Sequence, residues 1–332
     1  MSERRPRIGL ALGSGSFRGW AHIGVIRAIE ALGVQIDVVA GCSVGALVGA
    51  SYLEGRLDRL EAWALGLGAL EFARLFDVDL RGGAFVDRAR MRQVLVDRVC
   101  AAERRIETLD RPFAAVATDI TSGKEVWFTE GVLIDAVQAS MSLPGLFPPV
   151  RHENGWLVDG GLVNPVPVSI CRALGADRVI AVNLNGGIAG RYWNGARSGS
   201  GNGGLVGSVR ARLRDVTSRF GGEPDSGVES VAALPPPRSP GVFETIFGSV
   251  HIIQDRITRS RMAGDPPDLL ITPRLSDVGL MDFQRARDCI DEGAASVRRI
   301  APELHYVLGL EADTGDPDGD ADAEAGRDEG GS

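Results

Sequence analysis

The sequence predicts an α/β fold, a three-layer α/β/α sandwich around a mainly parallel sheet. Short apolar runs alternate with helical patterns from residue 7 onwards, as in a parallel sheet that is covered by helices. Glycine-rich turns follow three of these runs, at 13–19, 41–45 and 160–161. Because ligands bind beyond the carboxyl ends of the strands in open parallel sheets, we expect these turns to converge on one site.

The individual elements follow from periodicity and from glycine and proline stops. A helical pattern of apolar residues ends at Gly33, and another is stopped by Pro144. We expect strands at 7–12, 36–41, 113–120, 124–131, 156–161, 178–185 and 268–275. We expect helices at 20–33, 44–55, 133–142, 167–176, 205–220, 242–263 and 282–304.

Composition divides the chain into four parts. Residues 1–185 are the predicted core with all three turns, and 242–308 are expected to complete it with helices and a strand. Residues 186–241, rich in Gly, Pro and Arg, are predicted to be a mobile or lid-like insertion, and 309–332 a disordered acidic tail. Within the insertion, 205–220 has an apolar stripe flanked by arginines. This pattern suits a lid, a helix in peripheral contact with a membrane, or a helix packed on the core.

Charge and cysteine content exclude several classes of protein. The net charge of −8 argues against a nucleic-acid-binding surface. The four cysteines are far apart, which disfavours a zinc site and a disulfide framework and fits a reducing compartment. No signal peptide is predicted, and no run reaches about 18 apolar residues. We therefore expect a cytoplasmic protein, either free or peripheral to the inner face of the membrane. The oligomeric state cannot be inferred.

Ser43 lies between two glycines in G-C-S-V-G, residues 41–45. A nucleophile elbow needs a strand, a sharp turn and a helix, with small residues beside the serine. The strand at 38–40, the neighbours Gly41 and Gly45, and a helix from Val44 meet these conditions. The alternative is a buried serine that caps the start of a helix.

The first turn, GSGSFRG at 13–19, has the composition of an anion-binding loop. Glycines let the backbone turn sharply and expose N–H groups, and the following helix adds its positive end. Such a turn can hold a phosphate or a developing oxyanion, although an ordinary tight turn has the same composition. A dinucleotide site would need an acid about 20 residues further on, and none stands in VVAGCSVG.

Asp159 ends a strand and is followed by Gly160 and Gly161. Those glycines allow another backbone to approach the carboxylate closely, and desolvation would raise its pKa and make it a better base. The alternative is an Asx turn in which Asp159 caps the next segment.

The histidines offer no obvious base for Ser43. His22 is expected to be packed within a helix, and His152 to lie in an exposed hairpin turn. His251 falls on an amphipathic stretch and His305 near the end of the last helix. None of them follows a strand end, so a Ser-His-Asp triad is disfavoured.

Together, the first turn with Arg18, the G-C-S-V-G elbow and the D-G-G turn resemble the patatin-like phospholipase family. Their order along the chain matches that of the family, with Asp159 about a hundred residues C-terminal to Ser43. The segments SMSLPGLFPPV (140–150) and DGGLVNPVPV (159–168) also resemble bacterial members. The resemblance covers residues 7–185, with a weaker similarity in 242–305.

The resemblance implies a patatin-like fold and a catalytic dyad, with Ser43 as nucleophile and Asp159 as base. It implies hydrolysis of lipid acyl esters through an acyl-enzyme, with no cofactor and no metal. Backbone N–H groups of the first turn would form the oxyanion hole, at Gly15, Ser16, Phe17 and Arg18. The motif glycines are Gly13, Gly19, Gly41, Gly45, Gly160 and Gly161.

The chain departs from the family at Ser14 and Ser16, because the family's first turn is often all glycine. Serine serves there if its φ is allowed, whereas a positive φ at Ser16 would strain the turn. Two alternatives to a lipid acyl hydrolase therefore stay open. One is a catalytically weak regulatory or lipid-binding protein of the same fold. The other is a nucleotide-binding α/β protein, which the missing acid disfavours.

Overall fold

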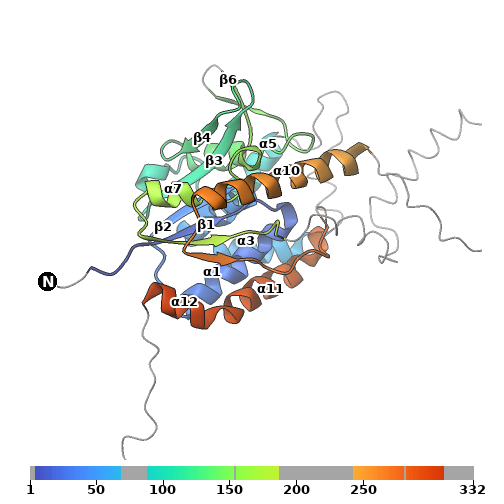
Figure 1. Cartoon of the computed structure of the whole chain (residues 1–332). Helices are drawn as coiled ribbons and strands as arrows, with labels where there is room; N and C mark the ends of the chain where they lie inside the picture. The colour runs from blue at the N-terminus through green and yellow to red at the C-terminus, as the bar shows by residue number, and fades with distance from the viewer. Residues whose placement is uncertain (1–3, 69–87, 153–154, 187–241, 280–281, 310–332) are drawn as a thin grey trace, which may run out of the picture.

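A computed structural model describes residues 4–68, 88–152, 155–186, 242–279 and 282–309 (Figure 1). Most of the predicted insertion, including the expected helix at 205–220, lies outside the described residues, and so does the predicted tail from residue 310.

A mixed sheet forms the centre of the molecule. Its described strands run in the order β5-β6-β3-β2-β1-β7-β8, and β4 pairs with β3 beside this path. The pairs along β3-β2-β1-β7-β8 are parallel, whereas β4, β5 and β6 are joined in antiparallel pairs. The strands are β1 (Ile8–Leu12), β2 (Val38–Cys42), β3 (Phe113–Asp119), β4 (Glu125–Phe128), β5 (Val150–His152), β6 (Gly155–Asp159), β7 (Arg178–Val182) and β8 (Leu269–Ile271).

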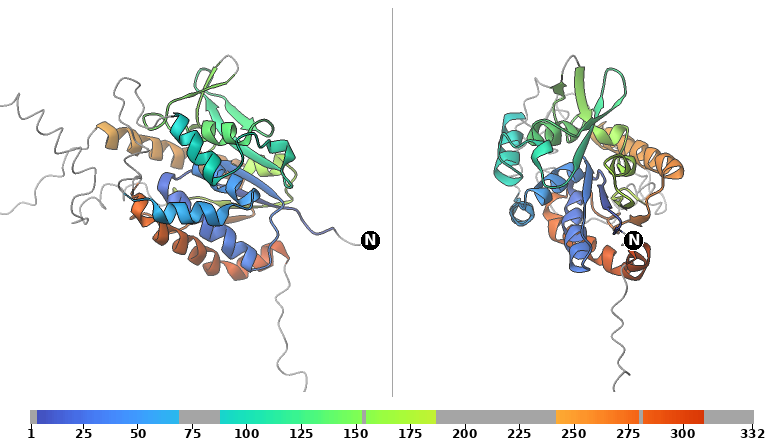
Figure 2. Two further views of the ribbon diagram at one scale, coloured as in Figure 1. Left: turned by 180° about the vertical axis from the view of Figure 1, so that it is seen from behind. Right: turned by 90° about the vertical axis from the view of Figure 1, so that its left-hand side faces the viewer.

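Helices cover both faces of the sheet, which confirms the three-layer α/β/α architecture. Helices α7 and α10 lie on one side, and α1 and α11 on the other (Figures 1 and 2). The described α-helices are α1 (Ala21–Ala31), α2 (Val44–Leu53), α3 (Leu57–Gly66), α5 (Arg88–Arg98), α6 (Leu133–Ser140), α7 (Val168–Ala173), α10 (Val242–Gly264), α11 (Ala286–Arg299) and α12 (Ala301–Leu308). Short 3₁₀ helices are η1 (Ser16–Trp20), η2 (Ile106–Thr108), η3 (Gly160–Leu162) and η4 (Phe283–Arg285).

The two faces of the sheet differ in side-chain size. On β1, Ile8, Leu10 and Leu12 point into the larger core with α1, α2 and α11, whereas Ala11 belongs to the core beneath α7. At Gly9 a Cβ would lie 2.7 Å from the Ala176 Cβ. Small residues on this face therefore let the α7 layer approach the sheet closely.

Sequence periodicity located most of these elements, with clear exceptions. The helix expected at 282–304 is two helices, because Pro302 lacks an N–H and cannot continue α11 but is tolerated in the first turn of α12. Helices α3 and α5 were not predicted, and neither was strand β5. His152, which was expected in a hairpin turn, is the last residue of β5.

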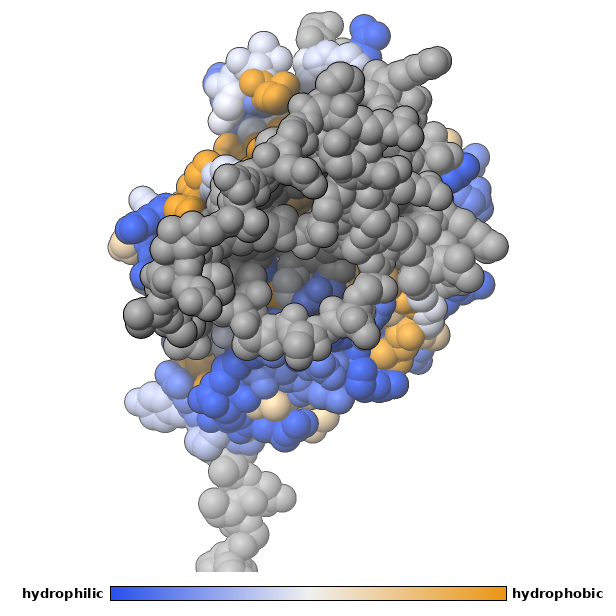
Figure 3. Space-filling model, turned by 90° about the vertical axis from the view of Figure 1, so that its right-hand side faces the viewer, coloured by the Kyte–Doolittle hydropathy of each residue, from blue (hydrophilic) through white to orange (hydrophobic). Residues whose placement is uncertain are grey.

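The visible described surface is mainly hydrophilic, with apolar side chains in separate groups (Figure 3). The exposed large apolar residues include Ile246, Ile252 and Ile253 on α10, and Trp127 and Trp156 at the antiparallel end of the sheet. Of the described helices, none has the length and apolar character needed to cross a bilayer.

Candidate functional site

The register of β3 brings Ser43 and Asp159 together. On one edge of β3, Val116 pairs with Cys42, the last residue of β2, and Ala117 pairs with Asp159, the last residue of β6. Strand β4 occupies the opposite edge at both positions. The end of β2 and the end of β6 therefore meet head to head beside one strand, which places Ser43 next to Asp159.

Ser43 has a backbone conformation that side chains rarely adopt. Its φ is 57° and its ψ is −124°, and its N–H donates to Ser140 Oγ at 2.8 Å. A Cβ on Gly45 would lie 2.1 Å from the Leu12 carbonyl oxygen, and one on Gly41 would lie 2.5 Å from the Ala46 backbone. Both flanking glycines are therefore required by close backbone contacts, as a strained strand-turn-helix elbow demands.

The first turn is held by neighbours that are distant in the sequence. Gly13 N–H donates to Val182 O at 3.0 Å, and Ser14 N–H donates to Pro165 O at 2.8 Å. At Gly15 a Cβ would lie 2.7 Å from the Leu184 side chain, and at Gly19 it would lie 2.2 Å from the Val44 side chain. The turn is thus tied to β7, to the segment before α7, and to the elbow itself.

Two amides of the first turn are available to a ligand. Within the described part of the chain, the N–H groups of Gly15 and Ser16 donate no hydrogen bond. The N–H of Arg18 donates to the Gly15 carbonyl at 3.2 Å. This differs from the expectation that the Arg18 amide is a free donor, since the chain winds into η1 from Ser16 onwards.

Asp159 is a buried carboxylate, with 1% of its surface exposed. Burial raises its pKa to about 6, and hydrogen bonds from the Ser43 side chain and the Gly161 amide oppose the rise. Gly161 N–H donates to Asp159 Oδ1 at 2.7 Å. At Gly160 a Cβ would lie 2.3 Å from the Val116 carbonyl oxygen. Gly160 is therefore required by a close backbone contact, whereas a Cβ on Gly161 would lie 2.3 Å from the Gln254 side chain.

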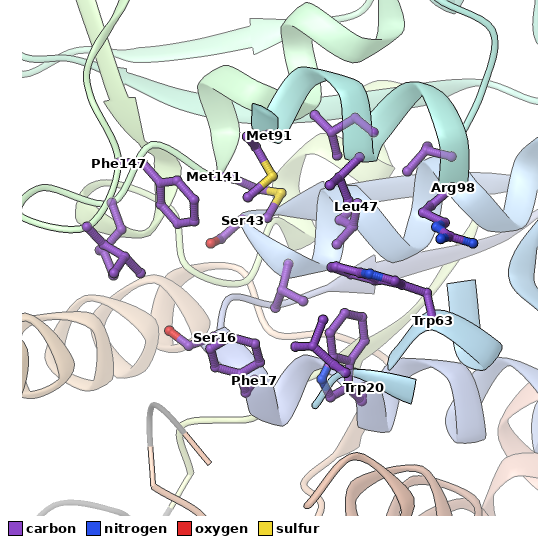
Figure 4. A pocket seen from close by; sticks show the side chains of 17 residues that line it. Ser16, Phe17, Trp20, Ser43, Leu47, Trp63, Met91, Arg98, Met141 and Phe147 are labelled. Carbon is purple, nitrogen blue, oxygen red and sulfur yellow. The ribbon is translucent and has the colours of Figure 1, made fainter. Parts of the chain in front are cut away.

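Two pockets meet at Ser43. The apolar pocket encloses about 800 Å³, part of it open to solvent, and extends from Ser43 to Arg98 and Trp63 (Figure 4). Its walls are formed by apolar side chains, among them Phe17, Trp20, Leu47, Met91, Met141 and Phe147. The small pocket, of about 250 Å³, contains Asp159. Ser16, Ser43 and Leu143 line both pockets.

Helix α10 supplies residues to the small pocket that the sequence did not reveal. Phe247, Val250, His251 and Gln254 line it. Both ring nitrogens of His251 lie 3.4 Å from Arg18 Nη2, and burial together with the Arg18 charge lowers the pKa of His251 to about 3. His251 is therefore uncharged at neutral pH. The sequence predicted that His251 lies on an amphipathic helix, but no local sequence pattern indicates which face of this helix covers the small pocket.

Gln254 belongs to a buried polar network around Ser14. Gln254 Oε1 accepts from Ser14 Oγ at 3.3 Å and from Asn185 Nδ2 at 3.1 Å. Asn185 Nδ2 also lies 3.3 Å from Ser14 Oγ. The Ser14 side chain is thus hydrogen-bonded to Gln254 on α10 and to Asn185, which follows β7.

None of the remaining histidines, His22, His152 and His305, lines either pocket. His22 is fully buried as expected, and its Nε2 donates to the Gly13 carbonyl at 2.8 Å. Burial lowers the pKa of His22 to about 4. His152 packs its ring edge-on against Phe128. No group of three or more His, Cys, Asp or Glu within the described ranges is arranged to hold a metal ion.

Comparison with known proteins places this arrangement in a family. A family model described as patatin-like phospholipase matches residues 10–172. An uncharacterized NTE family protein of Mycobacterium tuberculosis is 36% identical over 330 residues, covering 87% of this chain and 90% of that one. The chain belongs to the patatin-like phospholipase family.

Patatin-like domains of larger proteins are also similar to this chain. Human patatin-like phospholipase domain-containing protein 6 is 35% identical over 189 residues, covering 53% of this chain and 13% of that protein. A Caenorhabditis elegans protein with a patatin-like phospholipase domain is 36% identical over 184 residues, again 53% of this chain and 13% of that protein. The patatin-like match at 10–172 contains all three turns, whereas α10, with His251 and Gln254, lies beyond it.

Proposed function

We propose that this protein is a serine acyl hydrolase of the phospholipase A or esterase type, in which Ser43 and Asp159 cleave lipid acyl esters. The observation that carries the proposal is the position of Ser43. It stands in a strained elbow between an apolar pocket and a buried carboxylate whose pKa is raised to about 6. Membership of the patatin-like phospholipase family supports a lipid substrate.

In the proposed reaction, Ser43 Oγ attacks the ester carbonyl carbon and its proton passes to Asp159. The carbonyl oxygen becomes an oxyanion that accepts hydrogen bonds from the free amides of Gly15 and Ser16. The tetrahedral intermediate collapses, and the leaving alkoxide takes the proton from Asp159. Water then attacks the acyl-enzyme with Asp159 again as base, which releases the fatty acid and restores Ser43.

The two pockets are proposed to bind different parts of the substrate. The acyl chain fits the apolar pocket, where burial of each methylene contributes about 0.8 kcal/mol. The alcohol part faces the small pocket with Asp159, His251 and Gln254. The raised pKa of Asp159 suits a base at neutral pH, because the group is ionised yet more basic than an exposed aspartate.

Hydrolysis of p-nitrophenyl esters and labelling by a fluorophosphonate test this proposal. We expect Ser43→Ala and Asp159→Asn to lower kcat by about 10³-fold or more, and Ser43→Ala to abolish labelling. Ser249→Ala and Asp97→Asn, at exposed positions, are the matched controls. The kcat/KM of the wild type should rise with pH to a plateau above about 6, as Asp159 loses its proton. Full activity in both dyad variants would refute the mechanism.

A specific observation keeps a second candidate open. Ser16 has a φ of 50°, the strained conformation that the sequence analysis identified as a risk to the oxyanion turn. A catalytically weak regulatory or lipid-binding protein would show a folded wild type that binds lipid but neither labels nor turns over. Peripheral membrane contact through 205–220 and a cytoplasmic location stay predictions from the sequence.

A further inference from the structure

Among the described residues outside glycine, only Ser16 and Ser43 have a positive φ. The strain at Ser43 has an evident purpose in an elbow, but Ser16 could be replaced by glycine, which adopts such a φ without cost. A serine side chain at this position therefore needs a reason beyond the path of the backbone.

Structural hydrogen bonding does not supply that reason. The Ser16 hydroxyl makes no hydrogen bond to any residue in the described ranges. The neighbouring Ser14 is the opposite case, since its hydroxyl is held between Gln254 and Asn185. As far as the described residues go, the Ser16 hydroxyl is thus a free donor, whereas the Ser14 hydroxyl is used in structural hydrogen bonds.

The position of Ser16 points to the reaction centre. Ser16 and Ser43 both line the apolar pocket and the small pocket. In Figure 4 the two side chains lie at the same end of the apolar pocket, with Arg98 at the other end. The free amide of Ser16 and its hydroxyl are three bonds apart, so the side chain can turn its O–H to the oxygen that the amide faces.

We infer that the Ser16 hydroxyl is a further catalytic donor, which hydrogen-bonds the oxyanion of the tetrahedral intermediate beside the Ser16 and Gly15 amides. The inference rests on the proposed hydrolase function. The serine that differs from the family's glycine is then not a defect of the turn, because its side chain adds a hydrogen-bond donor that glycine lacks. Strain that persists at an active site is expected when it serves the reaction.

Two substitutions separate the hydroxyl from the strain. Ser16→Ala keeps the Cβ, and with it the backbone strain of the positive φ, but removes the hydroxyl. Ser16→Gly removes both the strain and the hydroxyl. We expect both variants to lower kcat by about 10- to 100-fold with KM changed less than about twofold, because the donor acts in the transition state. Ser16→Gly should also melt at a higher temperature than the wild type. Ser249→Ala is the control for an exposed serine.

A long-chain trifluoromethyl ketone provides a readout that a merely structural role would not move. Ser43 Oγ adds to its carbonyl, the proton passes to Asp159, and the hemiketal oxyanion mimics the intermediate. Its inhibition constant should rise in both Ser16 variants by the same factor as kcat/KM falls. A Ser16→Gly enzyme that hydrolyses esters and binds the ketone like the wild type would overturn the inference. Loss of the proposed function itself is distinguished by a wild type that neither labels with fluorophosphonate nor turns over.

Discussion

The turns that carry Ser43 and Asp159 differ from the first turn in what holds them. Beside Ser43 and Asp159, Gly45 faces Leu12 O and Gly160 faces Val116 O, whereas Gly161 faces the Gln254 side chain. In the first turn, Gly13 faces the Val182 carbonyl oxygen, but Gly15 and Gly19 face the side chains of Leu184 and Val44. A contact with the backbone of a neighbouring strand leaves less room to adjust than a contact with a side chain, because a side chain can shift. The turns of Ser43 and Asp159 are therefore held mainly by backbone contacts with the sheet, and the first turn depends more on partners from β7, the elbow and α10.

The largest effect is expected from adding a methyl group in the rigid elbow. In Gly45→Ala the new Cβ would lie 2.1 Å from the Leu12 carbonyl oxygen, so β1 and α2 must separate. We expect a loss of several kcal/mol in the free energy of unfolding and no measurable hydrolysis. Urea denaturation followed by circular dichroism measures this.

Gly248→Ala is the matched control for Gly45→Ala, because a Cβ at Gly248 would meet nothing within 4 Å. It should be neutral or stabilise α10 by about 0.5–1 kcal/mol. If Gly45→Ala folded and hydrolysed esters like this control, the contrast between rigid and adjustable turns would be broken.

Asp159→Asn measures how much the buried Asp159 carboxylate lowers the free energy of unfolding. Because burial raises the folded pKa from 3.8 to about 6, the neutral acid is favoured below pH 4, and this advantage is lost as the pH rises through 6. At pH 7.5 the variant should be more stable than the wild type by roughly 3 kcal/mol, although we expect it to be inactive. At pH 4 the two should unfold alike. Equal stability at both pH values would show that the buried carboxylate costs nothing.

The smallest effect is expected in the adjustable turn. Gln254→Leu removes the acceptor of Ser14 Oγ and Asn185 Nδ2 while keeping the side-chain volume similar. We expect destabilisation of about 1–2 kcal/mol and a kcat reduced by about 10-fold, because the turn is looser but intact. Arg256→Leu, on the exposed side of α10, is the control. A Gln254→Leu enzyme with unchanged kcat would show that the first turn needs no support from α10.

Several features could be predicted because their causes are local. The β-turn-α units at 7–55 follow from apolar runs that glycines interrupt, and the three turns stand where strands end. The family resemblance named Ser43 and Asp159 for the same reason, since each motif is a short segment with small neighbours. Helices α3 and α5 were missed: α5 carries four arginines among eleven residues, which hides its buried Met91 and Leu95.

The local sequence by itself indicated the turns of Ser43 and Asp159, because each is a short strand end with small neighbouring residues. The contacts that require Gly45 and Gly160 come from other strands, at Leu12 O and Val116 O. Only the tertiary structure decided the rest of the site. The register of β3 brings Cys42 and Asp159 beside consecutive residues of one strand. The approach of α10, whose sequence position is some two hundred residues from Ser43, brings His251 and Gln254 into the small pocket. The φ of Ser16 likewise follows from contacts of the first turn with remote elements, which no local pattern records.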